Sequence, residues 1–260
     1  MKSVIAQYYP GESAVHRLDP RVKVVVVTAF GLALFARDSF AALAVFGVVA
    51  LIAIGVSRVP PGWFWRGLTP VFWLLGITFV AQALVARGQA FFSFGPIHLS
   101  REGLVLSVFL SLRLIVLVLI GSLLTLTTSP IALTDAIAWL GRPLRRLRVP
   151  IDELALMVTI ALRFIPTLMA ELENIMRAQR ARGAEFSRGG LVRRARALIP
   201  VLVPLFVVSF KRADELALAM DARCYEPGQV RTRMYPLHSR PSDFVVLCGS
   251  VAVIATAAVL

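Results

Sequence analysis

Two arginine triplets are the residues of this chain whose types and spacing are best suited to binding another molecule. They share the order small residue, arginine, small residue: Ala181-Arg182-Gly183 and Ala222-Arg223-Cys224. A guanidinium is planar, permanently charged and carries five donors, so Arg182 and Arg223 suit docking onto carboxylates or backbone carbonyls of a second protein. An arginine near a helix C-terminus also compensates the helix dipole, for about 0.3–1 kcal/mol. Each triplet alone leaves both explanations open.

Other catalytic or ligand-binding patterns are missing from the sequence. It contains no phosphate-binding GxxxxGKS/T loop and no GxGxxG, HExxH or GxSxG motif. The three histidines, His16, His98 and His238, fall in different predicted loops, which argues against a shared metal site. The two cysteines form no CxxC pair and indicate no disulfide framework. We therefore predict that the chain is not an enzyme, binds no cofactor itself, and depends on a partner for energy.

Composition points to a membrane protein with unevenly distributed charge. The 260 residues are 58% hydrophobic and have a formal net charge of +13, with a mean hydropathy of +0.77. A typical soluble domain is only about 45–50% apolar. Residues 141–240 hold 18 of the 28 Lys and Arg but only 9 of the 15 Asp and Glu. Most of the basic excess therefore belongs to one region.

Five segments are apolar enough to cross a bilayer, which needs about 20 residues per helix. They are Val22–Ala36, which is short for a span, Phe40–Val56, Leu68–Ala86, Gly103–Thr125 and Asp243–Leu260. Residues 37–39 are predicted to be a turn, and residues 87–101, with two glycines and a proline, a loop. Lys and Arg are in excess in the N-terminal segment and in residues 57–67, which places both in the cytoplasm. After four spans, residues 129–240 are also predicted to be cytoplasmic.

Two further apolar runs, residues 154–170 and 198–210, leave the topology open. Arg163 and Pro166 interrupt the first, and a central arginine costs about 2.5–3.5 kcal/mol on insertion scales. The second is short and contains Pro200 and Pro204, which kink helices. We favour helices that lie along or below the membrane face, while one or both crossing the membrane remains the alternative.

Both triplets end predicted amphipathic helices. The first helix runs from about Pro150 to Arg182, and Gly183 suits a left-handed cap position. Its apolar face has 3/4 spacing: Ile165, Leu168, Met169, Leu172 and Met176. The second helix ends before the Tyr225–Gly228 segment, and its face has 4-3-4-3 spacing: Phe206, Phe210, Ala213, Ala217 and Met220. Each triplet thus follows a helix whose apolar face is able to pack against a partner.

The chain resembles the transmembrane T component of energy-coupling factor (ECF) transporters, importers of vitamins and metals driven by ABC-type ATPases. Two X-Arg-X triplets at the ends of coupling helices are typical of that family and match the two triplets here. The N-terminal residues 9–23, YPGESAVHRLDPRVK, also resemble the family's start. Cys224 departs from the glycine common at its position. The match extends over nearly the whole chain.

The resemblance implies an all-α polytopic membrane protein with about five transmembrane helices plus a helical cytoplasmic coupling domain. Residues 1–128 would form a membrane domain of four spans, 129–240 the coupling domain with its amphipathic helices, and 241–260 the last transmembrane helix. The protein would lie in the cell membrane and transmit ATP-driven motion of two ABC-type ATPase subunits to a separate membrane substrate-binding subunit for vitamin or metal uptake. Substrate specificity would belong to that other chain.

The same resemblance assigns the site residues. Each triplet would enter a groove of one ATPase subunit, through Ala181, Arg182, Gly183, Ala222, Arg223 and Cys224. The substrate-binding subunit would contact Met169, Leu172, Met176 and Met220, because methionine-rich surfaces adapt to changing contacts. ATP would be used by the partner subunits, and no metal would be bound.

Two other functional classes are considered. A self-sufficient secondary transporter needs ionisable residues inside its spans, and Arg113 is almost the only candidate; we predict that it bonds helix carbonyls or Gln82. A membrane-embedded enzyme needs clustered carboxylates or histidines, and His16 with Asp19 is the only close pair. The basic clusters at residues 142–148 and 193–196 lie beside apolar segments, where attraction to anionic headgroups explains them without nucleic acid.

Overall fold

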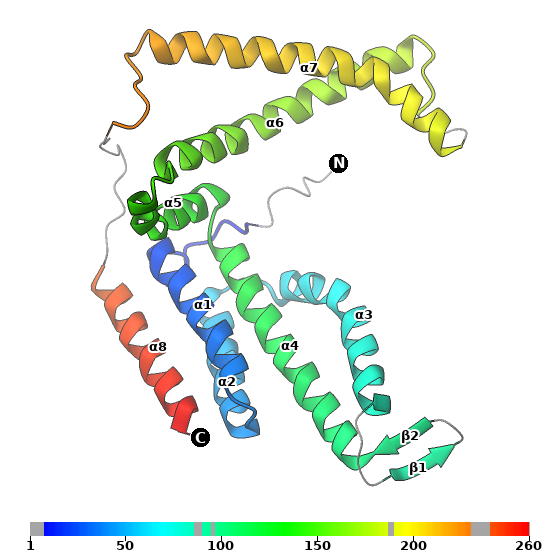
Figure 1. The fold of residues 1–260 in the computed structure, drawn as a ribbon, viewed down its shortest axis with the longest axis vertical. Helices are drawn as coiled ribbons and strands as arrows, with labels where there is room; N and C mark the ends of the chain where they lie inside the picture. Colours follow the sequence, from blue (N-terminus) through cyan, green and yellow to red (C-terminus); the bar gives the residue numbers. More distant parts are fainter. Residues whose placement is uncertain (1–7, 86–89, 95–96, 187–189, 230–239, 260) are drawn as a thin grey trace. The chain divides into compact units, whose positions relative to one another are not determined.

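The computed structural model describes residues 8–85, 90–94, 97–186, 190–229 and 240–259. It divides into two compact units (Figure 1): unit 1 joins Met1–Leu140 with Tyr235–Leu260, and unit 2 is Gly141–Met234. The predicted functional domains had their boundaries at 128/129 and 240/241. The difference arises mainly from one short helix after residue 128, which packs within unit 1. The functional division stays a prediction.

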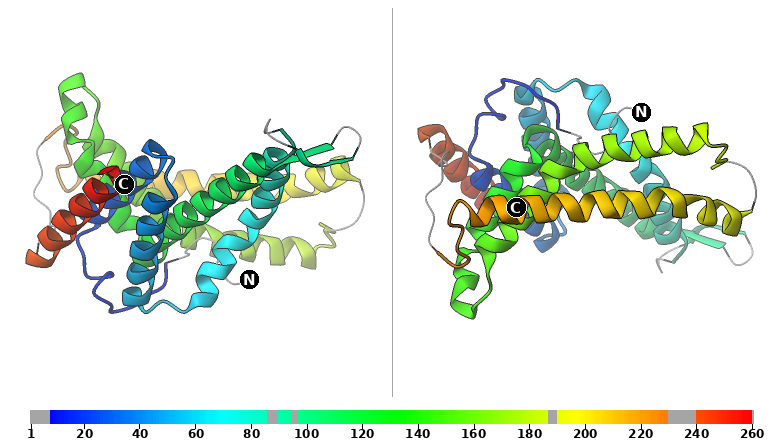
Figure 2. Two further views of the ribbon diagram at one scale, coloured as in Figure 1. Left: turned by 90° about the horizontal axis from the view of Figure 1, so that it is seen from below. Right: turned by 90° about the horizontal axis from the view of Figure 1, so that it is seen from above.

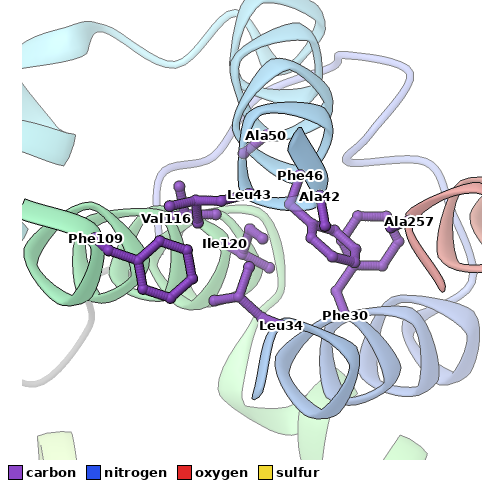
Figure 3. Packing of buried hydrophobic residues seen from close by; sticks show 10 residues of the cluster. All are labelled: Phe30, Leu34, Ala42, Leu43, Phe46, Ala50, Phe109, Val116, Ile120 and Ala257. Carbon is purple, nitrogen blue, oxygen red and sulfur yellow. The ribbon is translucent and has the colours of Figure 1, made fainter. Parts of the chain in front are cut away.

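Four helices of unit 1 enclose its main core. They are α1 (Pro20–Ala36), α2 (Phe40–Ser57), α4 (Arg101–Thr127) and α8 (Pro241–Val259). Each contributes side chains to one apolar cluster, shown in Figure 3: Phe30, Leu34, Ala42, Leu43, Phe46, Ala50, Phe109, Val116, Ile120 and Ala257. The rings of Phe30 and Phe46 meet edge to face at 5.3 Å, a favoured aromatic geometry. Packing of these apolar faces brings the last helix beside the first two.

Two more helices complete unit 1. Helix α3 (Pro61–Val85) packs along α4, and α5 (Pro130–Leu140) packs against α1. Figure 1 shows that α3 bends midway, which the missing backbone donor of Pro70 explains. Helix α1 begins at Pro20, two residues before the predicted segment, because Asp19 accepts the amide of Arg21 at 2.8 Å and Pro20 suits the first helical position.

Five helices in the described residues are long and apolar enough to cross a membrane. They are Phe40–Ser57, Pro61–Ala81, Glu102–Thr127, Ile151–Ala181 and Pro241–Val259. Four of them coincide with predicted spans, and Ala86 and Leu260, at the ends of two predictions, lie outside the described residues. The all-α, polytopic membrane fold is therefore confirmed.

Two helices differ from the predicted set of spans. Helix α1, expected to be a short span, has 17 residues and is about 26 Å long, less than the roughly 30 Å of a hydrocarbon core. The helix Ile151–Ala181, for which a surface position was favoured, has the length and composition of a span. These two criteria leave its position open, as the sequence did.

A small hairpin occupies part of the predicted loop at residues 87–101. Strands β1 (Ala90–Phe94) and β2 (Ile97–Ser100) pair antiparallel, with Ser93 opposite His98. Residues 95 and 96, between the two strands, and Gly88 lie outside the described residues. This hairpin is a local addition to a fold that is otherwise helical in the described residues.

Unit 2 consists of a 3-10 helix, η1 (Arg142–Leu147), and two long helices, α6 (Ile151–Ala181) and α7 (Leu191–Asp221). The 31 residues of α6 agree with the predicted helix from about 150 to 182. Helices α6 and α7 pack against each other, and Figure 2 shows the pair from two further directions. Val201 is the one buried side chain among the described residues of this unit, at 1% exposed. The two long helices therefore share a small contact and expose most of their surfaces.

Candidate functional site

Helix α6 ends in a Schellman cap that contains the first triplet. The amide of Gly183 donates to the carbonyl of Arg180 at 3.0 Å, and the amide of Ala184 donates to that of Gln179 at 3.0 Å. These two bonds close the last turn and require a left-handed residue between them. Gly183 supplies it with a φ of 85°, as predicted. Arg182 occupies the cap position itself.

Helix α7 ends in the same hydrogen-bond pattern around the second triplet. The amide of Cys224 donates to the carbonyl of Asp221 at 2.9 Å, and the amide of Tyr225 donates to that of Met220 at 3.0 Å. Cys224 has a φ of 55°, so it holds the left-handed position that Gly183 holds in α6. The two triplets are therefore equivalent in backbone conformation, although their third residues differ.

The side chains of both triplet arginines are exposed. The side chains of Arg182 and Arg223 make no hydrogen bond or ion pair with any residue that the structure describes. Each guanidinium stands at a helix C-terminus, where its charge is locally favoured by the helix dipole. With all of their donors available, both are ready to bind acceptors on another molecule.

The left-handed cysteine leads to a prediction about the caps. A side chain in the left-handed region costs about 1–2 kcal/mol, so Cys224→Gly should stabilise the α7 cap and Gly183→Ala should destabilise the α6 cap. A Cβ on Gly183 would meet no atom within 4 Å, so the second effect comes from φ alone. We expect amide hydrogen exchange at Tyr225 to slow about fivefold and exchange at Ala184 to quicken by a similar factor. Unchanged exchange in both variants would contradict the assigned caps.

The two triplets lie at opposite ends of the helix pair. Beyond α7, the amide of Gly228 donates to the carboxylate of Glu153 at 2.8 Å, which connects the segment after α7 to the first turn of α6. Arg182 follows the far end of α6, whose 31 residues span about 46 Å. Arg182 and Arg223 are therefore separated by about one helix length, and a single small pocket is unable to hold both (Figure 1).

Unpartnered apolar side chains cover much of both helices. No residue of α6 is buried, Met169 is 36% exposed, and Leu172, Met176 and Met220 are half-buried. Helix α7 carries a longer exposed stripe with helical spacing: Leu198, Ile199, Leu202, Val203, Phe206, Val207 and Phe210. Contiguous apolar surface of this kind marks contact with a membrane or another protein. Met169, Leu172 and Met176 lie on α6 and Met220 lies near the end of α7, and their contact with a substrate-binding subunit stays a prediction.

A buried polar cluster at the start of α1 contains residues that the sequence analysis did not assign. Asp243, 2% exposed in the first turn of α8, accepts the amides of Asp19 at 3.0 Å and Arg240 at 2.6 Å. Lys23 donates to the backbone carbonyls of Thr127 at 2.9 Å and His16 at 3.3 Å. These contacts tie α8 and the end of α4 to the N-terminal segment. Charged residues inside otherwise apolar helices were the available signal.

His16 and Asp19, the pair considered for an enzyme, are each committed to structural contacts. The His16 ring donates from Nε2 to the carbonyl of Tyr9 at 3.0 Å, and Nδ1 accepts from the hydroxyl of Ser13 at 2.7 Å. One neutral tautomer satisfies both bonds, and burial lowers the pKa of His16, although the hydrogen bond to Tyr9 opposes the shift. No cluster of three metal-binding side chains occurs in the described residues.

Arg113, the ionisable residue in the fourth predicted span, supports a turn. Its guanidinium donates to the carbonyl of Arg37 at 2.5 Å and to the carboxylate of Asp38 at 2.6 Å, and it lies 4.5 Å from the centre of the Phe109 ring. The prediction named helix carbonyls or Gln82; the structure instead shows the carbonyl of Arg37 and the carboxylate of Asp38, both in the turn between α1 and α2. The side chain of Gln82 lies outside the described part.

Comparison with known proteins identifies close relatives over nearly the full length. The family described as "Cobalt transport protein" (CbiQ) matches residues 11–235. A protein of Thermosediminibacter oceani is 49% identical over 95% of this chain and 93% of its own length. Relatives from Clostridium kluyveri and Bacillus subtilis are 48% and 43% identical, over 96% and 97% of this chain and 93% and 96% of their own lengths. All three are called energy-coupling factor transporter transmembrane protein EcfT.

Proposed function

This chain belongs to the energy-coupling factor transporter transmembrane protein family, and from that premise we propose that it couples two ABC-type ATPases to a separate membrane substrate-binding subunit. It is a multi-pass transmembrane component of a transporter. The proposal adds the transmission of ATP-driven motion, with ATP bound and hydrolysed by the partner subunits. The imported substrate would be a micronutrient, a vitamin or a metal, held by the substrate-binding subunit.

The observation that carries the proposal is the pair of matching arginine caps. Two equivalent backbone motifs present two uncommitted guanidinium groups, about one helix length apart. This arrangement suits one docking groove on each of two similar ATPase subunits. A rigid guanidinium fork fits carboxylates and carbonyls in such a groove better than a flexible ammonium would.

The contact between α6 and α7 suits transmission of movement. Val201 is the one buried side chain in the described part of unit 2, and Pro200 and Pro204 remove backbone donors on either side of it. Because this crossing buries so little area, it resists rotation of one helix relative to the other less than a packed core would. When the ATPases close, they would move the two helix ends, and the helices would pivot about this crossing.

The exposed apolar faces give the moving helices a surface for the substrate-binding subunit. Met169, Leu172, Met176 and Met220 are the proposed contacts, and each is at least partly exposed. Thioether side chains adapt to different neighbours with little loss of packing. Movement of α6 and α7 would then be transferred to the partner in the membrane.

Copurification tests the proposed function directly. The tagged chain, extracted in mild detergent from cells that also produce the candidate ATPases and substrate-binding subunit, should bring down two ATPase subunits per chain and one substrate-binding subunit. Substrate uptake by these cells should require all of the chains. A tagged chain that is folded and recovers no ATPase would overturn the proposal.

The proposed orientation places both triplets in the cytoplasm and the turn between α1 and α2 outside. Two single-cysteine proteins test it: Ala36→Cys with the native cysteines replaced by serine, and the protein with native Cys224 alone. Both positions are exposed. A membrane-impermeant maleimide should label Ala36→Cys in intact cells and Cys224 only after the membrane is opened. The opposite pattern would reverse the orientation.

A further inference from the structure

A groove in unit 1 lies between the N-terminal segment, the end of α2 and the start of α8. Its volume is about 620 Å³, and each of these three segments contributes one arginine to its lining: Arg17, Arg58 and Arg240. The transport function proposed above leaves this groove without a role.

The groove carries an excess of positive charge. Glu12 is the one carboxylate among the described residues that line it, and Glu12 pairs with Arg17 at 3.4 Å. The guanidinium groups of Arg58 and Arg240 have no partner within the described part of the chain. Guanidinium groups with free donors that line one groove favour an anion that offers several oxygens, and phosphate is the closest geometric match.

Backbone hydrogen bonds order the main chain at all three arginines before any ligand arrives. Arg58 caps α2, and its amide donates to the carbonyl of Gly55 at 3.4 Å. The amide of Arg240 donates to buried Asp243 at 2.6 Å, and the amide of Arg17 donates to the carbonyl of Ser13 at 3.2 Å. A site whose parts are already ordered loses less entropy when it binds.

Apolar surface next to the groove distinguishes a lipid from a soluble anion. Val56, which lines the groove, is 47% exposed, and Phe244 and Val245 follow in the first turns of α8, each 71% exposed. Just beyond Arg58, Trp63 and Trp65 are exposed, as is typical of a membrane interface. The headgroup of a lipid at this position would contact the guanidinium groups, and its acyl chains would contact the exposed apolar side chains.

We propose that this groove binds the phosphate headgroup of an anionic glycerophospholipid, with the acyl chains along the apolar surface beside Val56. The phosphate is held by Arg58 and Arg240, with Arg17 at the edge. Bound lipid would add a further link between the N-terminal segment, α2 and α8. This role is independent of the ATPase contacts and holds whether or not those are correct.

Lipid binding to the purified full chain tests the proposal. The delipidated chain in neutral detergent is titrated with phosphatidylglycerol, with phosphatidylcholine of the same acyl chains, and with inorganic phosphate, and bound lipid is counted by native mass spectrometry. We expect phosphatidylglycerol to bind more tightly than phosphatidylcholine, and millimolar phosphate not to displace it. Arg58→Gln with Arg240→Gln should weaken phosphatidylglycerol about 30-fold, at about one kcal/mol for each basic residue.

A matched control separates the groove from general basicity. Arg142→Gln with Arg146→Gln removes two exposed arginines from η1 and should leave phosphatidylglycerol binding unchanged. Melting temperatures in phosphatidylcholine should agree between the two double variants, which excludes misfolding. Equal weakening by both pairs would show general attraction and overturn the site. Equal binding of the two lipids would also overturn it, and displacement by phosphate would make it a free-anion site.

Discussion

Charge reversal of both triplet arginines, Arg182→Glu with Arg223→Glu, is expected to abolish recovery of ATPase subunits with the tagged chain and to stop substrate uptake. Each substitution removes a guanidinium that has no other partner in the described structure and puts a carboxylate in its place. Loss of one member of a desolvated charge pair costs about 2–5 kcal/mol, so two sites together should weaken the complex at least about 1,000-fold. Quantitative copurification and uptake assays measure both effects.

The single variants and a matched double variant sharpen this test. Because the caps lie about one helix length apart, Arg182→Glu and Arg223→Glu should each weaken one ATPase contact and leave the other. Arg177→Glu with Lys211→Glu makes the same change in charge on the same two helices, about one turn before the end of α6 and in the interior of α7, and should retain the ATPases. A triplet double variant that keeps full ATPase recovery and uptake would rule out the proposed coupling contacts.

Removal of the Asp243 carboxylate is expected to destabilise unit 1 strongly. Asp243→Ala leaves the amides of Asp19 and Arg240 without their acceptor in a buried position, and it removes a negative charge from the buried cluster that contains Lys23. Breaking a buried charged network costs about 3–5 kcal/mol. The melting temperature of the purified chain in detergent should fall by many degrees, and less membrane-inserted protein should accumulate.

Two further variants show whether the Asp243 effect arises from the buried contacts. Asp243→Asn keeps one acceptor oxygen of similar size and should lose less stability than Asp243→Ala. Asp214→Ala removes an exposed carboxylate from α7 and should change stability by no more than about 0.5 kcal/mol. If Asp243→Ala melts like Asp214→Ala, the buried cluster does not hold α8 in place.

The helix ends show how much of the candidate site follows from local sequence. The left-handed conformation of Gly183 was predictable because a cap is determined by the five or six residues around it. The same reasoning stopped at Cys224, where no glycine marks the position, although the backbone bonds are equivalent. Most spans were predictable too, since the bilayer sets the length of an apolar helix.

The hairpin at Ala90–Ser100 shows where local reasoning was insufficient. Glycine and proline indicated a break between helices, but whether the flanking residues pair as strands depends on register and on the adjacent helix ends. Local reasoning also leaves open whether α1 and α6 cross the membrane. Hydropathy and length describe the composition of a helix, whereas its position also depends on how it packs.

The sequence by itself determined the membrane fold class, most of the apolar helices, and the two arginine triplets at helix ends, because these depend on composition and on spacing within a few turns. The tertiary structure decided which distant residues meet. Asp19 bonds Asp243 across 224 positions, Arg113 bonds the turn at Asp38, and three arginines from separate segments line one groove. Helical periodicity gives the face of each side chain, and only the packing of one helix against another selects its partner.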